Sequence, residues 1–179
     1  MFKGLNALSR KNTATCVLLL GLFIIGTGCT TVQHRLEISD DYQPKPNIRF
    51  EVGAVTNTSG KRFDIDVEKR FAEALTKKLR KADLAWSGSG TPRIEGTTEI
   101  VYYEKGNAFT RWLAPGQGTT WLIVHCQLLE NNKVIGTADA KRAIYAGGGY
   151  TIGAWSYVFP DVAADIVADL KRRRLAKRL

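Results

Sequence analysis

The regular alternation of apolar and less apolar residues across residues 119–145 constrains the fold more than any other feature of this chain. If its first half forms a strand, one face is wholly apolar and carries Leu122, Val124, Cys126 and Leu128. Asn131 and Asn132 follow, and asparagine tolerates the positive φ of a tight turn. The pattern predicts two long strands joined as a β-hairpin, with one face buried in a core.

The same alternation bears on chemistry, because His125 and Cys126 are adjacent in the sequence. Neighbouring residues of a strand point to opposite faces, so these two side chains cannot act together as base and nucleophile. We expect Cys126 to be a small core residue and His125 to lie on the less buried face. The other histidine, His34, is distant in the sequence, and no metal site is expected.

Further elements surround the hairpin. Alternation predicts strands over residues 48–55 and 93–104, and apolar residues at helical spacing predict an amphipathic helix over residues 64–82. A last helix begins between Trp155 and Pro160, with Pro160 in its first turn, and runs to about Arg173. The sequence therefore predicts a single α+β domain over residues 48–173. It has a small antiparallel or mixed sheet of about four strands, with two helices packed on one face.

The N-terminal segment has the layout of an export signal. A basic start is followed by an apolar stretch from about residue 14 to residue 25, and then by small residues before Cys29. The apolar stretch is shorter than the ~20 residues that a membrane-spanning helix needs. Residues 1–28 are therefore predicted to direct export rather than to form a permanent span.

Cys29 has two competing interpretations. The small residues suit ordinary signal peptidase, whereas a small residue directly before a cysteine resembles the bacterial lipobox, although Gly26 stands where that motif usually has leucine. Cys16 lies within the signal and Cys126 is expected in the core, so Cys29 lacks a disulfide partner in a compartment that favours disulfides. We expect acylation of Cys29, and residues 29–47 are expected to be a polar tether that includes His34.

The net charge of +9 is concentrated at the two ends of the chain. Three cations precede Cys29 and six lie in the last nine residues, which leaves seventeen cations and seventeen acids in the body. A balanced body does not favour nucleic-acid binding, and no such partner is expected. The basic tail, residues 174–179, has two interpretations: it complements the dipole of the last helix, or it contacts an anionic surface.

Motifs typical of catalysis or cofactor binding are weak or absent in this sequence. The glycine-rich stretch AGGGYTIG, residues 146–153, has glycines one residue too widely spaced for the dinucleotide fingerprint, and it lacks the lysine of a phosphate-binding loop. It is interpreted as a connection between a strand and a helix. No catalytic residue, cofactor or metal ligand is assigned, and the protein is expected not to be an enzyme.

The most distinctive stretch is GNAFTRWLAPGQGTTWLIV, residues 106–124. It predicts an ordered loop that leads into the hairpin, in which Arg111 holds neighbouring carbonyls or a carboxylate, and Trp112 and Leu113 are packing anchors. The alternative is an exposed recognition loop in which Arg111, Trp112 and Leu113 contact a partner.

These features together resemble a family of small bacterial envelope lipoproteins catalogued as a domain of unknown function. The resemblance covers residues 48–170 and depends on the Arg-aromatic-Leu segment, the glycine-rich turn after it and the hairpin, behind a lipoprotein signal. Gly26 and the absence of glycine from the hairpin turn depart from the pattern. The resemblance implies a location and a fold but no catalytic residues. Thr30 after the cysteine resembles lipoproteins sent to the outer membrane.

Three hypotheses for function follow. The first is a non-enzymatic lipoprotein, anchored in the outer membrane through lipid on Cys29 and facing the periplasm, whose domain binds an envelope protein or a cell-wall partner. The second is an accessory subunit or activator of a cell-wall or secretion machine. The third is an envelope hydrolase built on carboxylates that folding brings together. The oligomeric state is left open.

Overall fold

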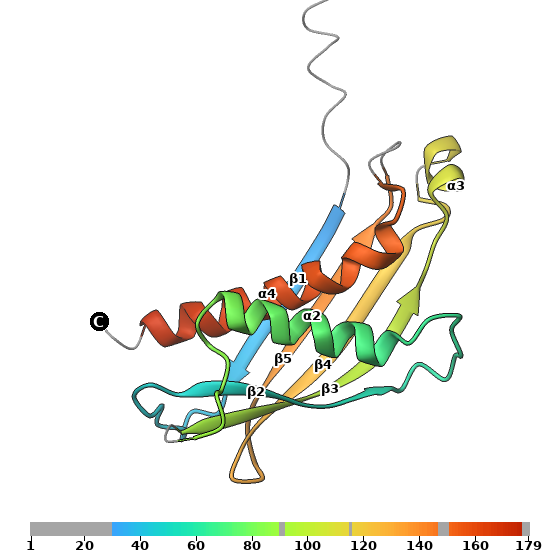
Figure 1. The fold of residues 1–179 in the computed structure, drawn as a ribbon. Helices are drawn as coiled ribbons and strands as arrows, with labels where there is room; N and C mark the ends of the chain where they lie inside the picture. Colours follow the sequence, from blue (N-terminus) through green and yellow to red (C-terminus); the bar gives the residue numbers. More distant parts are fainter. Residues whose placement is uncertain (1–29, 90–91, 115, 147–150, 177–179) are drawn as a thin grey trace, which may run out of the picture.

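A computed structural model describes residues 30–89, 92–114, 116–146 and 151–176 of the 179-residue chain. Within these segments the chain forms one five-stranded sheet and three helices (Figure 1). In chain order they are β1 (Thr30–Ile38), β2 (Arg49–Asn57), α2 (Val67–Lys81), β3 (Arg93–Glu104), α3 (Ala108–Leu113), β4 (Thr120–Glu130), β5 (Lys133–Ile144) and α4 (Ala154–Ala176).

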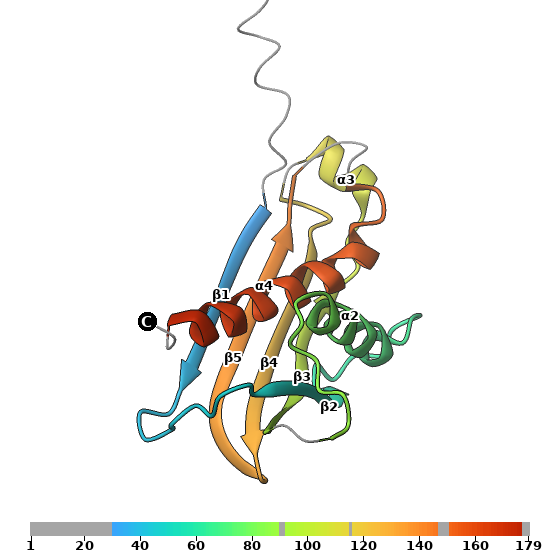
Figure 2. The ribbon, with the colours of Figure 1, turned by 60° about the vertical axis from the view of Figure 1, so that its left-hand side comes forward.

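The sheet is mixed and has the strand order β1-β5-β4-β3-β2. Strands β2 and β3 are parallel, and the other neighbours are antiparallel. Helices α2 and α4 cover one face, crossing the strands side by side (Figures 1 and 2). The predicted α+β class and the two helices on one face are confirmed. The described residues add one strand and one short helix to the predicted set.

The core lies between this helical layer and the sheet. The four apolar residues predicted for one face of β4 are all buried, and they pack with the apolar stripes of the two helices. The buried helical residues are Phe71, Leu75 and Leu79 from α2, and Val158, Phe159, Val162, Ala163, Ile166, Val167 and Leu170 from α4. Strand alternation and helical periodicity therefore predicted most of the core correctly.

The predicted hairpin is confirmed as β4 and β5. Asn131 and Asn132 form its turn with φ values of 52° and 64°, as expected for asparagines in a tight turn. Helix α2 begins at Val67, slightly later than predicted. The reason is Asp66, whose Oδ1 accepts a hydrogen bond from the Lys69 backbone at 2.8 Å and caps the helix.

The interpretation of residues 29–47 as a tether is wrong for Thr30–Ile38. This segment is β1, an edge strand paired with β5 from Thr30 opposite Ile144 to Ile38 opposite Gly136. An edge strand buries few side chains, so its apolar alternation is weak, and backbone hydrogen bonds to β5 supply much of its stability. Cys29 itself lies outside the described residues.

Two expectations about the last helix also need correction. Pro160 lies inside α4 and not in its first turn, because the helix already begins at Ala154. Proline leaves one helical carbonyl without its N–H partner, and the burial of Val158 and Phe159 around it offsets this loss. The helix continues to Ala176, so the first three residues of the expected basic tail are helical.

None of the helices in the described segments is both long enough and apolar enough to cross a membrane.

Candidate functional site

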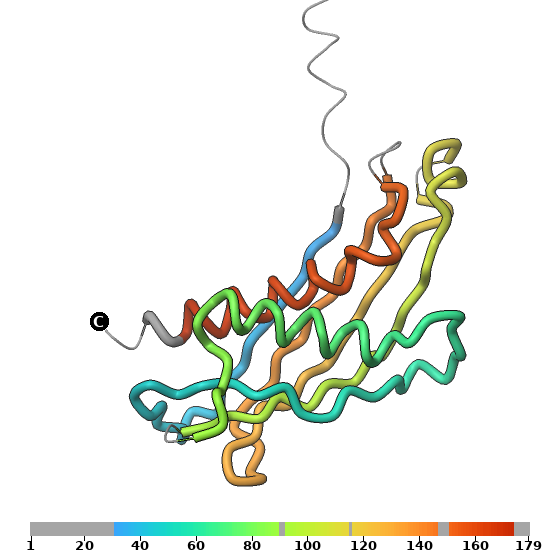
Figure 3. Tube along the Cα trace, in the orientation of Figure 1, coloured from blue at the N-terminus to red at the C-terminus, as the bar shows by residue number. Residues whose placement is uncertain are grey.

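Three segments meet at one end of the sheet. Thr30 at the start of β1 lies opposite Ile144 at the end of β5, which in turn lies opposite Thr120 at the start of β4. The tube in Figure 3 shows that the described chain enters the fold at the same end as α3, and that α4 runs away from it. Cys29 directly precedes Thr30 in the sequence.

Arg111 of α3 is the structural centre of this end of the sheet. Its side chain is 2% exposed, although arginine is rarely buried. Nη1 donates to the Gly118 carbonyl at 2.6 Å and to Thr120 Oγ1 at 2.9 Å, and Nη2 donates to the Thr151 carbonyl at 2.8 Å. Burial lowers the pKa of the Arg111 guanidinium. Of the two partners expected for Arg111, the structure shows carbonyls.

Helix α3 replaces the expected loop. Asn107 caps it, because its Oδ1 accepts from the Thr110 backbone at 3.0 Å, and the Asn107 N–H donates to the Gly118 carbonyl at 2.8 Å. Gly106 and Gly118 both have positive φ. A Cβ on Gly106 would lie 2.6 Å from the Gly118 carbonyl oxygen, so only glycine permits this closure. The result is a helix of six residues folded back against the start of β4.

Phe109, Trp112 and Leu113 lie on the outer side of α3, at the helical spacing that places three residues on one face. They are 66%, 60% and 61% exposed, and the rings of Phe109 and Trp112 have centroids 6.1 Å apart. The expectation that Trp112 and Leu113 are packing anchors is therefore wrong. Arg111 points inward and is inaccessible, whereas its two neighbours are available to a partner.

Ile152 is a further exposed apolar residue at this end of the sheet. It follows Thr151, whose carbonyl Arg111 binds, and it is 72% exposed. We call Phe109, Trp112, Leu113 and Ile152 the apolar tip. The other exposed large hydrophobic residues of the described chain are three valines, each less exposed than any member of the tip. The remaining glycine-rich residues 147–150 lie outside the described residues.

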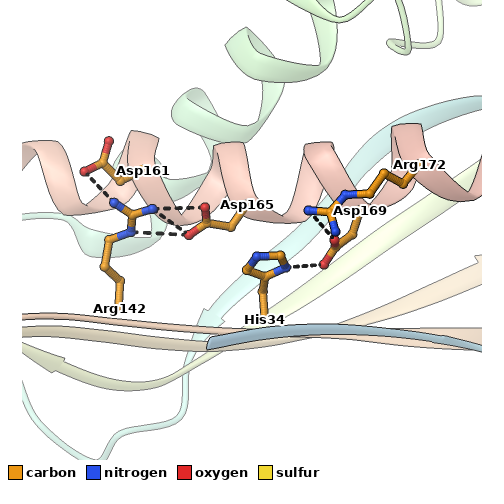
Figure 4. Close-up of polar contacts among 6 residues, drawn as sticks. All are labelled: His34, Arg142, Asp161, Asp165, Asp169 and Arg172. Atoms are coloured by element: carbon orange, nitrogen blue, oxygen red, sulfur yellow. Dashed lines mark hydrogen bonds and ion pairs between the residues drawn. The ribbon is translucent and has the colours of Figure 1, made fainter. Parts of the chain in front are cut away.

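A line of ion pairs joins α4 to the sheet (Figure 4). Asp161, Asp165 and Asp169 follow one another at four-residue spacing along the helix. Arg142 of β5 lies 3.0 Å from Asp165 and 3.3 Å from Asp161, and His34 of β1 lies 2.5 Å from Asp169. The expectation that His34 belongs to a tether is therefore wrong. The four-residue spacing of the acids, beside the apolar stripe of α4, was the sequence signal for this contact.

These ion pairs also bear on carboxylate chemistry. Each of the three acids has an arginine or histidine partner, and Asp169 has a second one in Arg172 at 3.3 Å. The arrangement ties a helix to two strands. Among the described residues no group of three or more His, Cys, Asp or Glu side chains is placed to hold a metal ion.

His125 and Cys126 lie on opposite faces of β4, as predicted. His125 Nδ1 is 2.6 Å from Asp139 Oδ1 across the open face of the sheet. Cys126 is buried on the helical side, where burial raises the pKa of its thiol to about 11. A neutral, buried thiol is not a nucleophile at neutral pH.

A small cavity of about 170 Å³ lies at the other end of the sheet. Its walls come mainly from the connection between β1 and β2, together with the ends of β1, β4 and α4, and they include Leu36, Ile38, Tyr42, Leu128 and Leu170. Burial raises the pKa of the Tyr42 hydroxyl to about 12. The cavity is well below the size of pockets that enclose metabolite-sized ligands.

The fold and this end of the sheet define a single α+β domain whose apolar tip lies at the end of the sheet where its first strand begins. Comparison of the sequence with protein-family models and with curated proteins finds no match. Solved structures share the fold. A PelC dodecamer from Paraburkholderia phytofirmans is 13% identical with a TM-score of 0.50, and it matches over 78% of this chain and 96% of its own.

Two further structures have similar coverage. A point variant of the same PelC, also a dodecamer, is 12% identical with a TM-score of 0.50, over 78% of this chain and 95% of its own. A candidate lipoprotein from Caulobacter crescentus CB15 is 13% identical with a TM-score of 0.37, over 74% of this chain and 93% of its own. At these identities the likeness extends to the fold alone.

Proposed function

We propose that this chain is a lipid-anchored protein of the bacterial envelope that serves as a non-enzymatic binding or accessory subunit of an envelope assembly. Acyl chains on Cys29 would hold it in the outer membrane, facing the periplasm. The observation that carries the proposal is the position of β1, which begins at the residue directly after Cys29 and is paired into the sheet along its whole length.

The position of β1 determines how far the domain can move from the membrane. A flexible tether would let the domain move away from the membrane, whereas an anchor joined directly to a sheet strand holds the domain at the surface. The His34–Asp169 contact further ties β1 to α4. Several acyl chains would make this attachment effectively permanent. The protein therefore acts at the membrane surface.

The role as a subunit is supported by the fold. PelC, which shares the fold over nearly its whole length, is a dodecamer. The acids of α4 are paired with Arg142, His34 and Arg172, which supports a structural rather than a catalytic role for them. We infer that the chain works by assembling with other envelope components.

Acyl labelling in cells tests the anchor. The full-length Cys29→Ser variant is compared with Cys126→Ala, which removes the other cysteine outside the signal. We expect Cys29→Ser to lose the acyl label and to leave the membrane fraction, and Cys126→Ala to keep both. Unchanged membrane retention of Cys29→Ser would contradict the anchor.

Assembly is tested separately. The protein is extracted in mild detergent and its mass is measured by light scattering after chromatography, alongside crosslinking in intact cells. We expect an oligomer, or a crosslinked complex with another envelope protein. A protein that stays monomeric and uncrosslinked would contradict the role as a subunit and would leave the anchor unaffected.

A further inference from the structure

We propose that the apolar tip, Phe109, Trp112, Leu113 and Ile152, inserts into the lipid bilayer as a second, non-covalent membrane contact beside the acyl chains. The inference rests on the proposed anchoring through Cys29 for the identity of the membrane. It goes beyond the anchor, because it assigns a membrane-binding surface to the folded domain and fixes the orientation of the domain on the bilayer.

The tip lies close to the anchoring point. Arg111 joins α3 to Thr120, and Thr120 is in register with Ile144 and, across β5, with Thr30. Neighbouring strands are about 4.8 Å apart, so the starts of β1 and β4 are separated by about 10 Å. A bilayer that holds acyl chains on Cys29 therefore meets this end of the sheet first (Figures 1 and 3).

The chemistry of this end suits a bilayer. Arg111 is the only charged residue among residues 106–124, and residues 143–160 contain none. The Arg111 charge is buried and bound to two carbonyls and a hydroxyl, so it does not meet the lipid. The nearest preceding cation, Lys105, lies 2.6 Å from Asp64. Charges are costly in a bilayer, whereas tryptophan prefers the interface between headgroups and acyl chains.

The tip is also held ready for insertion. A helix of six residues is not stable alone, but the Asn107 cap, the two glycines and the Arg111 hydrogen bonds fix α3 against β4. Helix α3 is therefore already ordered before the protein contacts lipid. Because of this, α3 loses little conformational entropy when it binds the bilayer.

The small size of the tip favours a bilayer over a protein partner. Stable protein interfaces bury about 800 Å² on each side and involve 20 to 30 residues, many more than the four of the tip. A bilayer needs no complementary shape, and a few apolar side chains suffice when an acyl anchor already keeps the protein at the surface.

Quenching of tryptophan emission by brominated phospholipids tests the proposal. The acylated protein is purified from membranes and reconstituted in vesicles of phosphatidylethanolamine and phosphatidylglycerol, with bromines at shallow or deep acyl positions. Trp112→Phe is compared with Trp86→Phe, a matched control, because Trp86 lies beside the starts of β2 and β3 at the opposite end of the sheet. We expect shallow bromines to quench the wild type, Trp112→Phe to lose more than half of this quenching, and Trp86→Phe to keep it.

Acylation is measured independently by mass spectrometry, which separates the two proposals. If acylated, vesicle-bound protein shows no quenching, the proposed insertion of the tip is wrong, and the proposed acylation of Cys29 is unaffected. If the protein is not acylated, the proposed acylation of Cys29 is wrong. Quenching by bromines after vesicles are added to this protein then still tests whether the tip inserts. If a variant carrying Phe109→Ser, Trp112→Ser and Leu113→Ser keeps its melting temperature but loses an oligomeric state, while the wild type is not quenched, the tip is a protein interface and the proposal is wrong.

Discussion

His34 Nδ1 lies 2.5 Å from Asp169 Oδ2, and this contact ties the edge strand β1 to helix α4 (Figure 4). Both side chains are largely shielded from water, so the contact is stronger than a pair on the open surface. In the proposed orientation, β1 also connects the domain to its anchor. The attachment of β1 therefore determines whether the domain stays fixed at the membrane.

Asp169→Ala is expected to weaken the attachment of β1. It removes the partner of His34, and the loss should lower the free energy of unfolding by about 1 to 2 kcal/mol and speed hydrogen exchange in β1. Arg172→Ala is the matched control, since it removes the exposed partner of the same carboxylate and should cost less than about 1 kcal/mol. Equal costs for the two variants, measured by urea denaturation, would contradict this role of His34.

Gly136→Ala is expected to separate β1 from β5. A Cβ at residue 136 would collide with the Glu37 carbonyl oxygen and lie 2.8 Å from Ile38 Cδ1, so the far end of β1 would have to move. Such overpacking costs about 1 to 3 kcal/mol. Hydrogen exchange should rise in β1 and stay low in β3, and the neighbouring variant Thr137→Ala should leave both unchanged. Unchanged protection of β1 in Gly136→Ala would contradict the close approach.

The contrast between the β4–β5 hairpin and β1 shows how much of this fold the sequence could predict. The hairpin carries its own signals, because Leu122 to Leu128 alternate over a full strand and two asparagines mark the turn. Strand β1 depends on the backbone of β5 and on Asp169, which is 135 residues from His34. Its own residues therefore give only a weak pattern.

The apolar tip was predictable only in part. The sequence singled out Arg111, Trp112 and Leu113, but six residues are too few for a helical period to show which of them points inward. The partners of Arg111 come from two separate segments of the chain, residues 118–120 and Thr151. Phe109 and Ile152 were missed, although the absence of charge around both was visible in the sequence.

Arg111→Ala is expected to lower the free energy of unfolding by about 2 to 4 kcal/mol. The change leaves a cavity and removes hydrogen bonds from two carbonyls and the Thr120 hydroxyl in a buried site. Trp112→Ala, at the next position, should change stability by less than about 0.5 kcal/mol, because that side chain is exposed. Melting temperatures of both variants provide the test, and a fully stable Arg111→Ala would show that its contacts are not structural.

Cys126 is expected to resist alkylation in the folded protein. The pKa of its thiol is raised to about 11 by burial, so at pH 8 it is neutral and shielded, and iodoacetamide should react only as fast as the protein opens.

The raised pKa of the Cys126 thiol also predicts that the stability of the protein depends on pH. Between its ordinary value near 9 and about 11 the unfolded thiol ionises before the folded one, so stability falls as pH rises through this range. Cys126→Ala should show a shallower fall; an equal slope would contradict the assignment.

Deletion of residues 174–179 is expected to leave membrane association unchanged. Arg173 and Ile38 line the same cavity, so α4 passes the end of β1 that is farthest from Thr30. Nine strand residues span about 27 Å, which places the base of the tail well away from Cys29 and the apolar tip. This arrangement favours the interpretation of the tail as the end of a helix over that of a contact with the anchoring membrane. Fractionation of cells at low salt, where electrostatic binding is strongest, measures the outcome, and release of the deletion variant would contradict the orientation.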